Sequence, residues 1–180
     1  GSIDTLSYSG IEFFDSEVDL NTSKIADSTN VLAMAYFFSE SQKLKNLTNT
    51  KDFLFEGVWF NDHIDFRSNI VAQEEENFIN LNGDLLFLKN KTEISFEKSD
   101  IFAIGKQWDL SPENKIIISN KEISFDNIKF FHGEQNITVN GAISDSVDKK
   151  LTVEINNFDV SNLDPVLAYD FDGEINGYLE

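Results

Sequence analysis

Cysteine is absent from this chain of 180 residues. The absence excludes a disulfide framework, a thiolate metal site and a cysteine nucleophile. Histidine is nearly absent too, because only His63 and His132 are present, far apart in the sequence. A metal site built on both would need the fold to bring them together beside a carboxylate. We therefore predict no metal site and no cofactor.

Basic residues are scarce, with 14 Lys and Arg against 32 Asp and Glu, which gives a net charge of −18. A surface that contacts phosphates would work against this field, so we exclude nucleic acid as a partner. Acidic chains that stay disordered are poor in aromatic residues, whereas this one contains 17 Phe and is 41% hydrophobic. The sequence therefore predicts a folded protein.

Long apolar runs are also missing. The longest, residues 31–38, is far shorter than the roughly 20 residues that a membrane-spanning helix needs. No basic and apolar signal peptide begins the chain, and Gly1-Ser2 resembles a cloning scar. We interpret residues 3–180 as one β-rich segment excised from a longer, repeat-like protein.

Alternation of apolar and polar residues is the main positive signal, and it dominates from about residue 53 onward. This period of two is typical of half-buried strands, and Ile, Val, Thr and Phe favour the same structure. Only two prolines occur, Pro112 and Pro165, and neither interrupts an alternating run, so both are expected in connections. The predicted strands include residues 53–60, 63–71, 93–97, 115–119, 122–126, 136–140 and 151–155.

These strands predict an all-β fold, built as a meandering, mostly antiparallel sheet. Residues 30–45 fit either an amphipathic helix or a long strand. We favour the strand, because aromatic residues 36–38 lie within it and a turn-rich segment follows.

A repeat is visible around three Asn-Gly pairs, in the segments near residues 79–101, 137–160 and 174–180. Gly83 and Gly141 are followed by an apolar strand, a polar stretch and a return strand, and Gly177 begins a partial third copy. A glycine inside a strand marks a bulge or a bend, whereas a glycine after Asn also suits a turn. The sequence alone allows both interpretations.

The segment from Ile101 to Ile143, and more distantly the rest to Glu180, resembles the C-terminal part of TamB-type translocation and assembly module proteins of the Bacteroidota, in the AsmA-like/TamB superfamily. The resemblance is one of ordered texture and assigns no individual residue a role. It is carried by residues 108–116, 123–128, 135–141 and 160–167, followed by Gly173 and Gly177.

The resemblance implies a parent protein anchored in the inner membrane that crosses the periplasm as a long β-rich trough. The sheet would then be elongated and curved, trough-like or solenoid-like, with an apolar concave face. Its apolar groove would conduct lipids between the membranes, or assist outer-membrane protein assembly with a TamA/BamA-like partner in the outer membrane. The expected partners are phospholipid acyl chains, and an open-edged fragment is also expected to self-associate through its edge strands.

One alternation per strand is expected to line the groove and to contact lipid, although an error of one residue would invert the chosen face of a strand. The selected positions are Leu81, Leu85, Phe87, Ile94, Phe96, Ile116, Ile118, Ile123, Phe125, Ile137, Val139, Ile143, Val153 and Ile155.

Catalytic signatures are missing, since no phosphate loop, nucleophile elbow or metalloprotease motif occurs. We predict that the chain is not an enzyme; a hydrolase would need a concave cluster of acids such as Glu56, Asp62 and Asp65. Residues 74–76 are acidic and suit a solvated hairpin tip, and residues 172–177 resemble a calcium loop but suit a turn and strand better. The main functional alternative is a β-sandwich or solenoid module for binding or adhesion at the cell envelope.

Overall fold

The computed structural model describes residues 1–8, 10–24, 31–44, 49–73, 76–146, 148–163 and 172–180. These residues form a single large sheet, with one short 3₁₀ turn, η1, at Val160–Leu163. The strands are β1 (Ser2–Tyr8), β2 (Ile11–Lys24), β3 (Val31–Leu44), β4 (Thr50–Phe60), β5 (His63–Ala72), β6 (Phe78–Leu88), β7 (Lys91–Phe96), β8 (Asp100–Ala103), β9 (Lys106–Leu110), β10 (Lys115–Ser119), β11 (Glu122–His132), β12 (Gln135–Ser144), β13 (Leu151–Asp159) and β14 (Glu174–Leu179).

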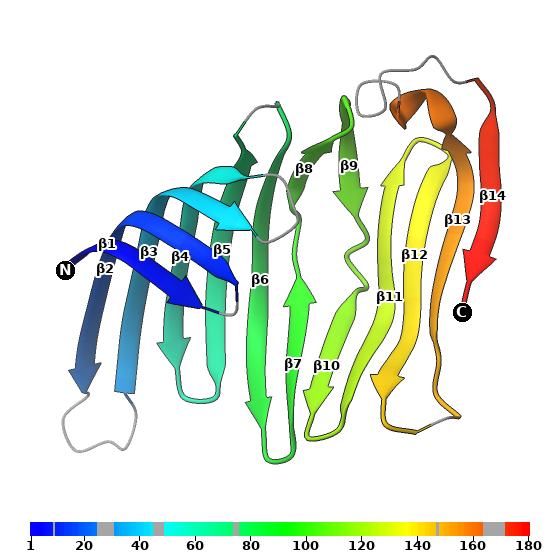
Figure 1. Ribbon diagram of the computed structural model, residues 1–180. Coiled ribbons are helices and arrows are strands. Elements are labelled where there is room, and N and C mark those ends of the chain that lie inside the picture. The colour runs from blue at the N-terminus through cyan, green and yellow to red at the C-terminus, as the bar shows by residue number, and fades with distance from the viewer. Residues whose placement is uncertain (9, 25–30, 45–48, 74–75, 147, 164–171) are drawn as a thin grey trace.

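The sheet is antiparallel throughout, and nearly every strand pairs with its neighbours in sequence (Figure 1). The one departure is a hairpin, β8–β9, inserted between β7 and β10. It pairs with β6 on one side and β11 on the other, so β7–β8 and β9–β10 each act as one interrupted strand. The predicted antiparallel all-β architecture is therefore confirmed.

The strand prediction for the N-terminal part also holds, because residues 31–44 form β3 and the helix alternative is wrong. Pairing explains the outcome: β3 hydrogen-bonds along nearly its whole length to both β2 and β4, whereas a helix over these residues would leave the facing edges of β2 and β4 without their partner. Pro112 lies between β9 and β10, as expected. The predictions for residues 27–30, 45–48, 74–75 and Pro165 fall outside the described residues.

Short polar side chains fill the gap where the two interrupted strands break. Asn114 is buried; its Oδ1 accepts a hydrogen bond from the Phe96 N–H at 2.7 Å, and its Nδ2 donates to the Phe96 carbonyl at 2.8 Å. Buried Ser99 donates to the Glu97 carbonyl at 3.1 Å. These bonds replace the ladder bonds lost at the break, so backbone groups there keep partners.

Further irregularities occur at residues in the left-handed region, among them Asp15, Asp52, Asn127 and Asn157, with φ from 48° to 53°. Asn and Asp tolerate this conformation better than other residues that carry a side chain. The pairing register shifts at three of these sites, as expected for β-bulges that bend a strand. In Figure 1 the strands β2, β3 and β4 arch over at one end.

The repeat glycines lie inside strands β6, β12 and β14, so the turn interpretation is wrong for all three. At Gly83 a Cβ would lie 2.4 Å from the Ser95 carbonyl oxygen, and at Gly141, with φ +99°, it would lie 2.0 Å from that of Lys150. The next strand therefore approaches too closely for any side chain. Gly141 is not itself the bulged residue. It pairs with Phe125 in β11, where the register shifts between Phe125 and Ile128.

Candidate functional site

All fourteen positions selected from the sequence lie on one face of the sheet, which we call the apolar face. Leu85, Ile94, Ile116 and Phe125 form one continuous row of cross-strand partners across β6, β7, β10 and β11. The other positions follow from alternation within these strands and from the partner pairs 118–123, 123–143, 137–155 and 139–153. The structure thus brings the selected residues together as a single surface.

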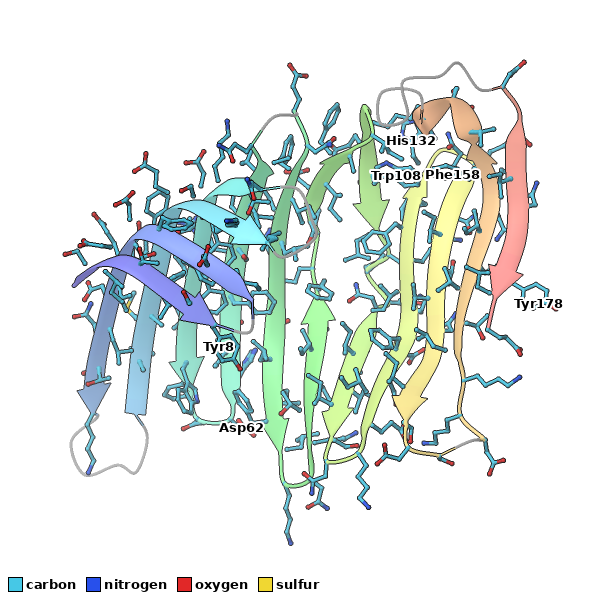
Figure 2. All side chains as sticks on the ribbon, in the orientation of Figure 1. Tyr8, Asp62, Trp108, His132, Phe158 and Tyr178 are labelled. Atoms are coloured by element: carbon cyan, nitrogen blue, oxygen red, sulfur yellow. The ribbon has the colours of Figure 1, made fainter. Side chains whose placement is uncertain are left out.

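The apolar face is closed at one end by a small core around Trp108. Trp108 and Phe158 lie close together at this end of the sheet (Figure 2). Trp108 is 4% exposed, stacks on Phe158 with ring centroids 6.1 Å apart, and donates from Nε1 to the Ala103 carbonyl at 3.1 Å. Ile101, Leu110 and Ile128 complete this cluster. Several selected residues pack against it, namely Leu81, Phe96, Ile116, Phe125, Ile137, Val139 and Ile155.

The other end of the same face is open to solvent, and we call its five side chains the open end. Trp59 is 50% exposed and Ile143 is 55% exposed, while Phe87, Ile118 and Ile123 are exposed at 38–40%. The rings of Trp59 and Phe87 lie 6.1 Å apart, and the three isoleucines are successive cross-strand partners. Large apolar side chains contiguous at this exposure are typical of a surface that meets another apolar body.

Trp59 was not among the selected positions, nor was any residue before Leu81. The sequence did carry a signal for Trp59, because this residue lies in the alternating run 53–60. In the structure its partner Ile64 pairs in turn with Leu85, which places Trp59 on the apolar face. An aromatic trio also extends the face toward the N-terminus: Phe13, Phe37 and Phe53 lie with ring centroids 5.4–5.8 Å apart. Only the pairing of distant strands shows that these residues share a face.

The opposite face is polar and carries ion pairs. Glu93 lies between Lys91, with Nζ–Oε1 at 2.6 Å, and Lys115, with Nζ–Oε2 at 2.8 Å. The hydrogen bond from Lys115, followed by that from Lys91, lowers the pKa of Glu93 to about 2. This sidedness, apolar on one face and charged on the other, is the usual pattern of an antiparallel sheet with one solvated face.

A wide hollow of about 1180 Å³ lies over the polar face of β2 to β6. Its lining includes six acidic side chains and one arginine, Arg67, which is paired with Glu56. The six acids are Glu17, Asp19, Glu56, Asp65, Asp84 and Glu97. The hollow therefore has a marked excess of negative charge, which attracts cations and repels anions.

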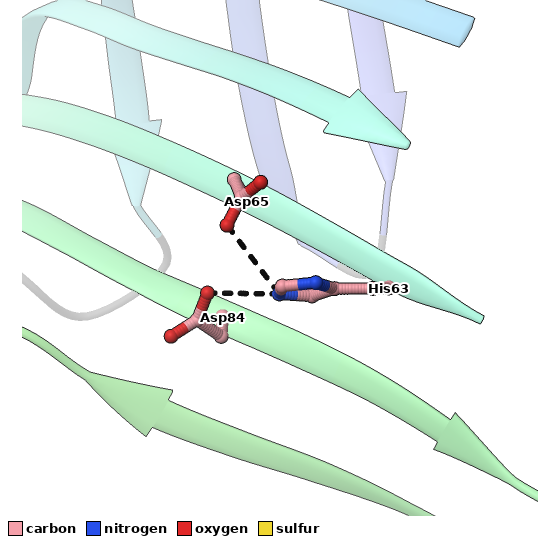
Figure 3. A group of neighbouring side chains, drawn as sticks. All are labelled: His63, Asp65 and Asp84. Carbon is pink, nitrogen blue, oxygen red and sulfur yellow. Dashed lines mark hydrogen bonds and ion pairs between the residues drawn. The ribbon is translucent and has the colours of Figure 1, made fainter. Parts of the chain in front are cut away.

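Beside this hollow, His63 meets two of the acids (Figure 3). Its Nε2 lies 2.9 Å from Asp84 Oδ1 and 3.4 Å from Asp65 Oδ1. The hydrogen bond with Asp84 raises the pKa of His63, against an opposing effect of desolvation. Among the described residues, this is the one group of three or more His, Asp and Glu side chains close enough to share a metal ion.

The other residues that the sequence singled out lie at several separate places on the sheet. His132 lies at the closed end, where its Nδ1 is 2.8 Å from the Gln107 carbonyl oxygen. Of the acids proposed for a hydrolase, Glu56 and Asp65 line the hollow, whereas Asp62 lies in the β4–β5 turn. The calcium-like segment forms the start of β14, as the turn-and-strand interpretation predicted.

Comparison of the chain with protein-family models, with curated protein sequences and with solved structures found no match. The resemblance to TamB-type proteins therefore stands on the sequence segments alone. Among the described residues, no helix is long and apolar enough to cross a membrane.

Proposed function

We propose that the open end of the apolar face binds lipid acyl chains, and that this chain is a non-enzymatic segment of a periplasmic lipid conduit or outer-membrane assembly scaffold. The observation that carries the proposal is the apolar face itself. One register aligns apolar side chains across β6 to β13, and at the open end no element of the described residues covers them.

Hydrophobic burial supplies the affinity in this proposal. Moving an acyl chain from water onto an apolar surface gains about 0.8 kcal/mol per buried methylene, without any directional bond. The net charge of −18 disfavours recognition through phosphate headgroups, so selectivity for the apolar tail suits this chain better than headgroup recognition. The trough shape, the inner-membrane anchor and the TamA/BamA-like partner belong to the same proposal and rest on the TamB resemblance.

The test is native mass spectrometry of the chain purified from bacteria, followed by extraction and identification of lipid. We expect phospholipid to accompany the wild-type chain. The triple variant Ile118→Ser, Ile123→Ser, Ile143→Ser removes exposed apolar surface from the open end and should lose most of this lipid. Because the three side chains lie away from the Trp108 core, the variant should stay folded.

A matched control is Ile117→Ser, since Ile117 neighbours Ile118 in β10 but points to the polar face. It should retain lipid. A compact wild-type monomer without lipid would overturn the proposal and favour a module for binding or adhesion. Equal lipid loss in the control and the triple variant would show that the open end is not the binding surface.

A further inference from the structure

We propose that His63, Asp65 and Asp84 bind a divalent transition-metal ion on the polar face of the sheet. The proposal is independent of lipid binding and revises the expectation from sequence that no metal site exists. It begins with the register: Asp65 and Asp84 are direct cross-strand partners, and His63 lies two residues before Asp65 on the same face. All three side chains therefore project from neighbouring positions on the same face of the sheet.

The spacing of the three side chains suits a single ion. Bonds of about 2.0–2.2 Å to a tetrahedral or octahedral ion place neighbouring ligand atoms about 2.8–3.6 Å apart. The distances from His63 Nε2 to Asp84 Oδ1 and Asp65 Oδ1, 2.9 and 3.4 Å, both fall within this range. One ligand atom from each residue lies within 4.8 Å of the others. Little movement would convert these contacts into coordination.

The charge of the site favours a cation independently of this spacing. Like charges directly opposite each other in an antiparallel pair are destabilising, and Asp65 and Asp84 form such a pair. The neighbouring hollow adds Glu17, Asp19 and Glu97 to the negative field, whereas its one arginine is already paired with Glu56. A divalent ion would remove the repulsion between the two aspartates and would also be attracted by the carboxylates of the neighbouring hollow.

The ligand types decide which cation fits. Ca²⁺ and Mg²⁺ prefer oxygen ligands, whereas one imidazole nitrogen with two carboxylates suits Zn²⁺, Mn²⁺ or Fe²⁺. The side chains of His63, Asp65 and Asp84 are 43%, 70% and 32% exposed, so water would complete the coordination. The site is therefore expected to exchange its metal readily rather than to hold it as a structural centre.

The presence of only two histidines makes the test direct, because each imidazole gives its own proton signals in an NMR spectrum of the untagged chain. Titration with Co²⁺ or Mn²⁺ should shift or broaden the signals of His63 at one equivalent and leave those of His132 sharp. His63→Ala assigns the signals. Asp84→Asn, which keeps the shape of the side chain, should weaken binding of Zn²⁺ at least tenfold by calorimetry.

His132→Ala is the control, since His132 contacts a backbone carbonyl and should not contribute to binding. Circular dichroism checks that each variant is folded. The proposal is overturned if the wild-type chain binds no metal at one equivalent. It is also overturned if His63→Ala or Asp84→Asn binds Zn²⁺ as tightly as the wild type does.

Discussion

The backbone N–H of Asn127 in β11 donates a 2.7 Å hydrogen bond to the side-chain Oδ1 of Asn140 in β12. The same relationship recurs between Asn157 in β13 and Asn176 in β14, also at 2.7 Å. In both cases the donor is a bulge residue with φ near 50°, and the acceptor is the asparagine of an Asn-Gly pair. In these two copies of the sequence repeat, the asparagine before the glycine thus satisfies the unpaired N–H of a bulge in the neighbouring strand.

Replacing Asn140 tests this role. Asn140→Ala leaves the Asn127 N–H without its partner, and we expect a loss of about 1 kcal/mol in the free energy of unfolding, measured by urea denaturation. Asn120→Ala, in the exposed β10–β11 turn, is the control and should change stability little. Equal stabilities for the two variants would contradict the role given to Asn140.

The repeat glycines offer a matched pair for a second prediction. Gly141→Ala places a Cβ 2.0 Å from the Lys150 carbonyl oxygen at a left-handed φ, so it should lower stability by at least about 2 kcal/mol. Gly177→Ala meets nothing within 4 Å and should be nearly neutral. Thermal or urea unfolding of both variants measures the difference, and similar losses would refute the close approach at Gly141.

The lowered pKa of Glu93 predicts that the free energy of unfolding decreases in acid. Its pKa of about 2 in the folded chain lies below the usual 4.5, so its stabilising effect is present above pH 4.5 and is lost as the pH falls toward 2. Urea denaturation at pH 7 and pH 3 should therefore show a smaller loss on acidification for Glu93→Gln than for the wild type. Glu134→Gln, in an exposed turn, should behave like the wild type; an unchanged loss in Glu93→Gln would contradict the prediction.

The two tryptophans report on opposite ends of the apolar face. Trp59 is half exposed at the open end, whereas Trp108 is buried at the closed end. Brominated phospholipid should quench the fluorescence of Trp108→Phe, which retains Trp59, more strongly than that of Trp59→Phe. Equal quenching would show that lipid does not distinguish the two ends, and absence of quenching in both would count against acyl-chain binding.

The sheet has two open edges, β1 and β14, and every residue of both strands is exposed. Unpaired edge strands template pairing with another chain, so sedimentation should show concentration-dependent association. Ile175→Lys places a charge on the β14 edge and should weaken association at least tenfold. Leu20→Lys makes the same change on β2, which is not an edge, and should leave association intact; equal effects would exclude edge pairing.

Much of the fold could be predicted from the sequence because strand alternation is a local property. The runs at 93–97, 115–119 and 151–155 became strands, since a period of two leaves one apolar face that only a sheet can use. The same period selected all fourteen apolar positions on a common face. In each strand the apolar face was predicted from the alternation of that strand alone, and a shift of one residue would have inverted the predicted face.

Other features depended on which strands meet, and sequence reasoning missed them for that reason. The β8–β9 hairpin between β7 and β10, the buried Asn114 and the open end around Trp59 all arise from contacts across strands. The cluster of His63, Asp65 and Asp84 is the clearest case. Asp84 lies 21 residues from His63, and no short sequence motif predicts that the two residues meet.

The sequence by itself determined the all-β class, the acidic surface and the apolar alternation, because each is set by residue type and neighbouring positions. The tertiary structure decided which end of the apolar face is buried around Trp108, which end is left open, and which carboxylates meet a histidine. These outcomes depend on strand register and on the bulges at residues such as Asn127, which fix distances between residues far apart in the chain.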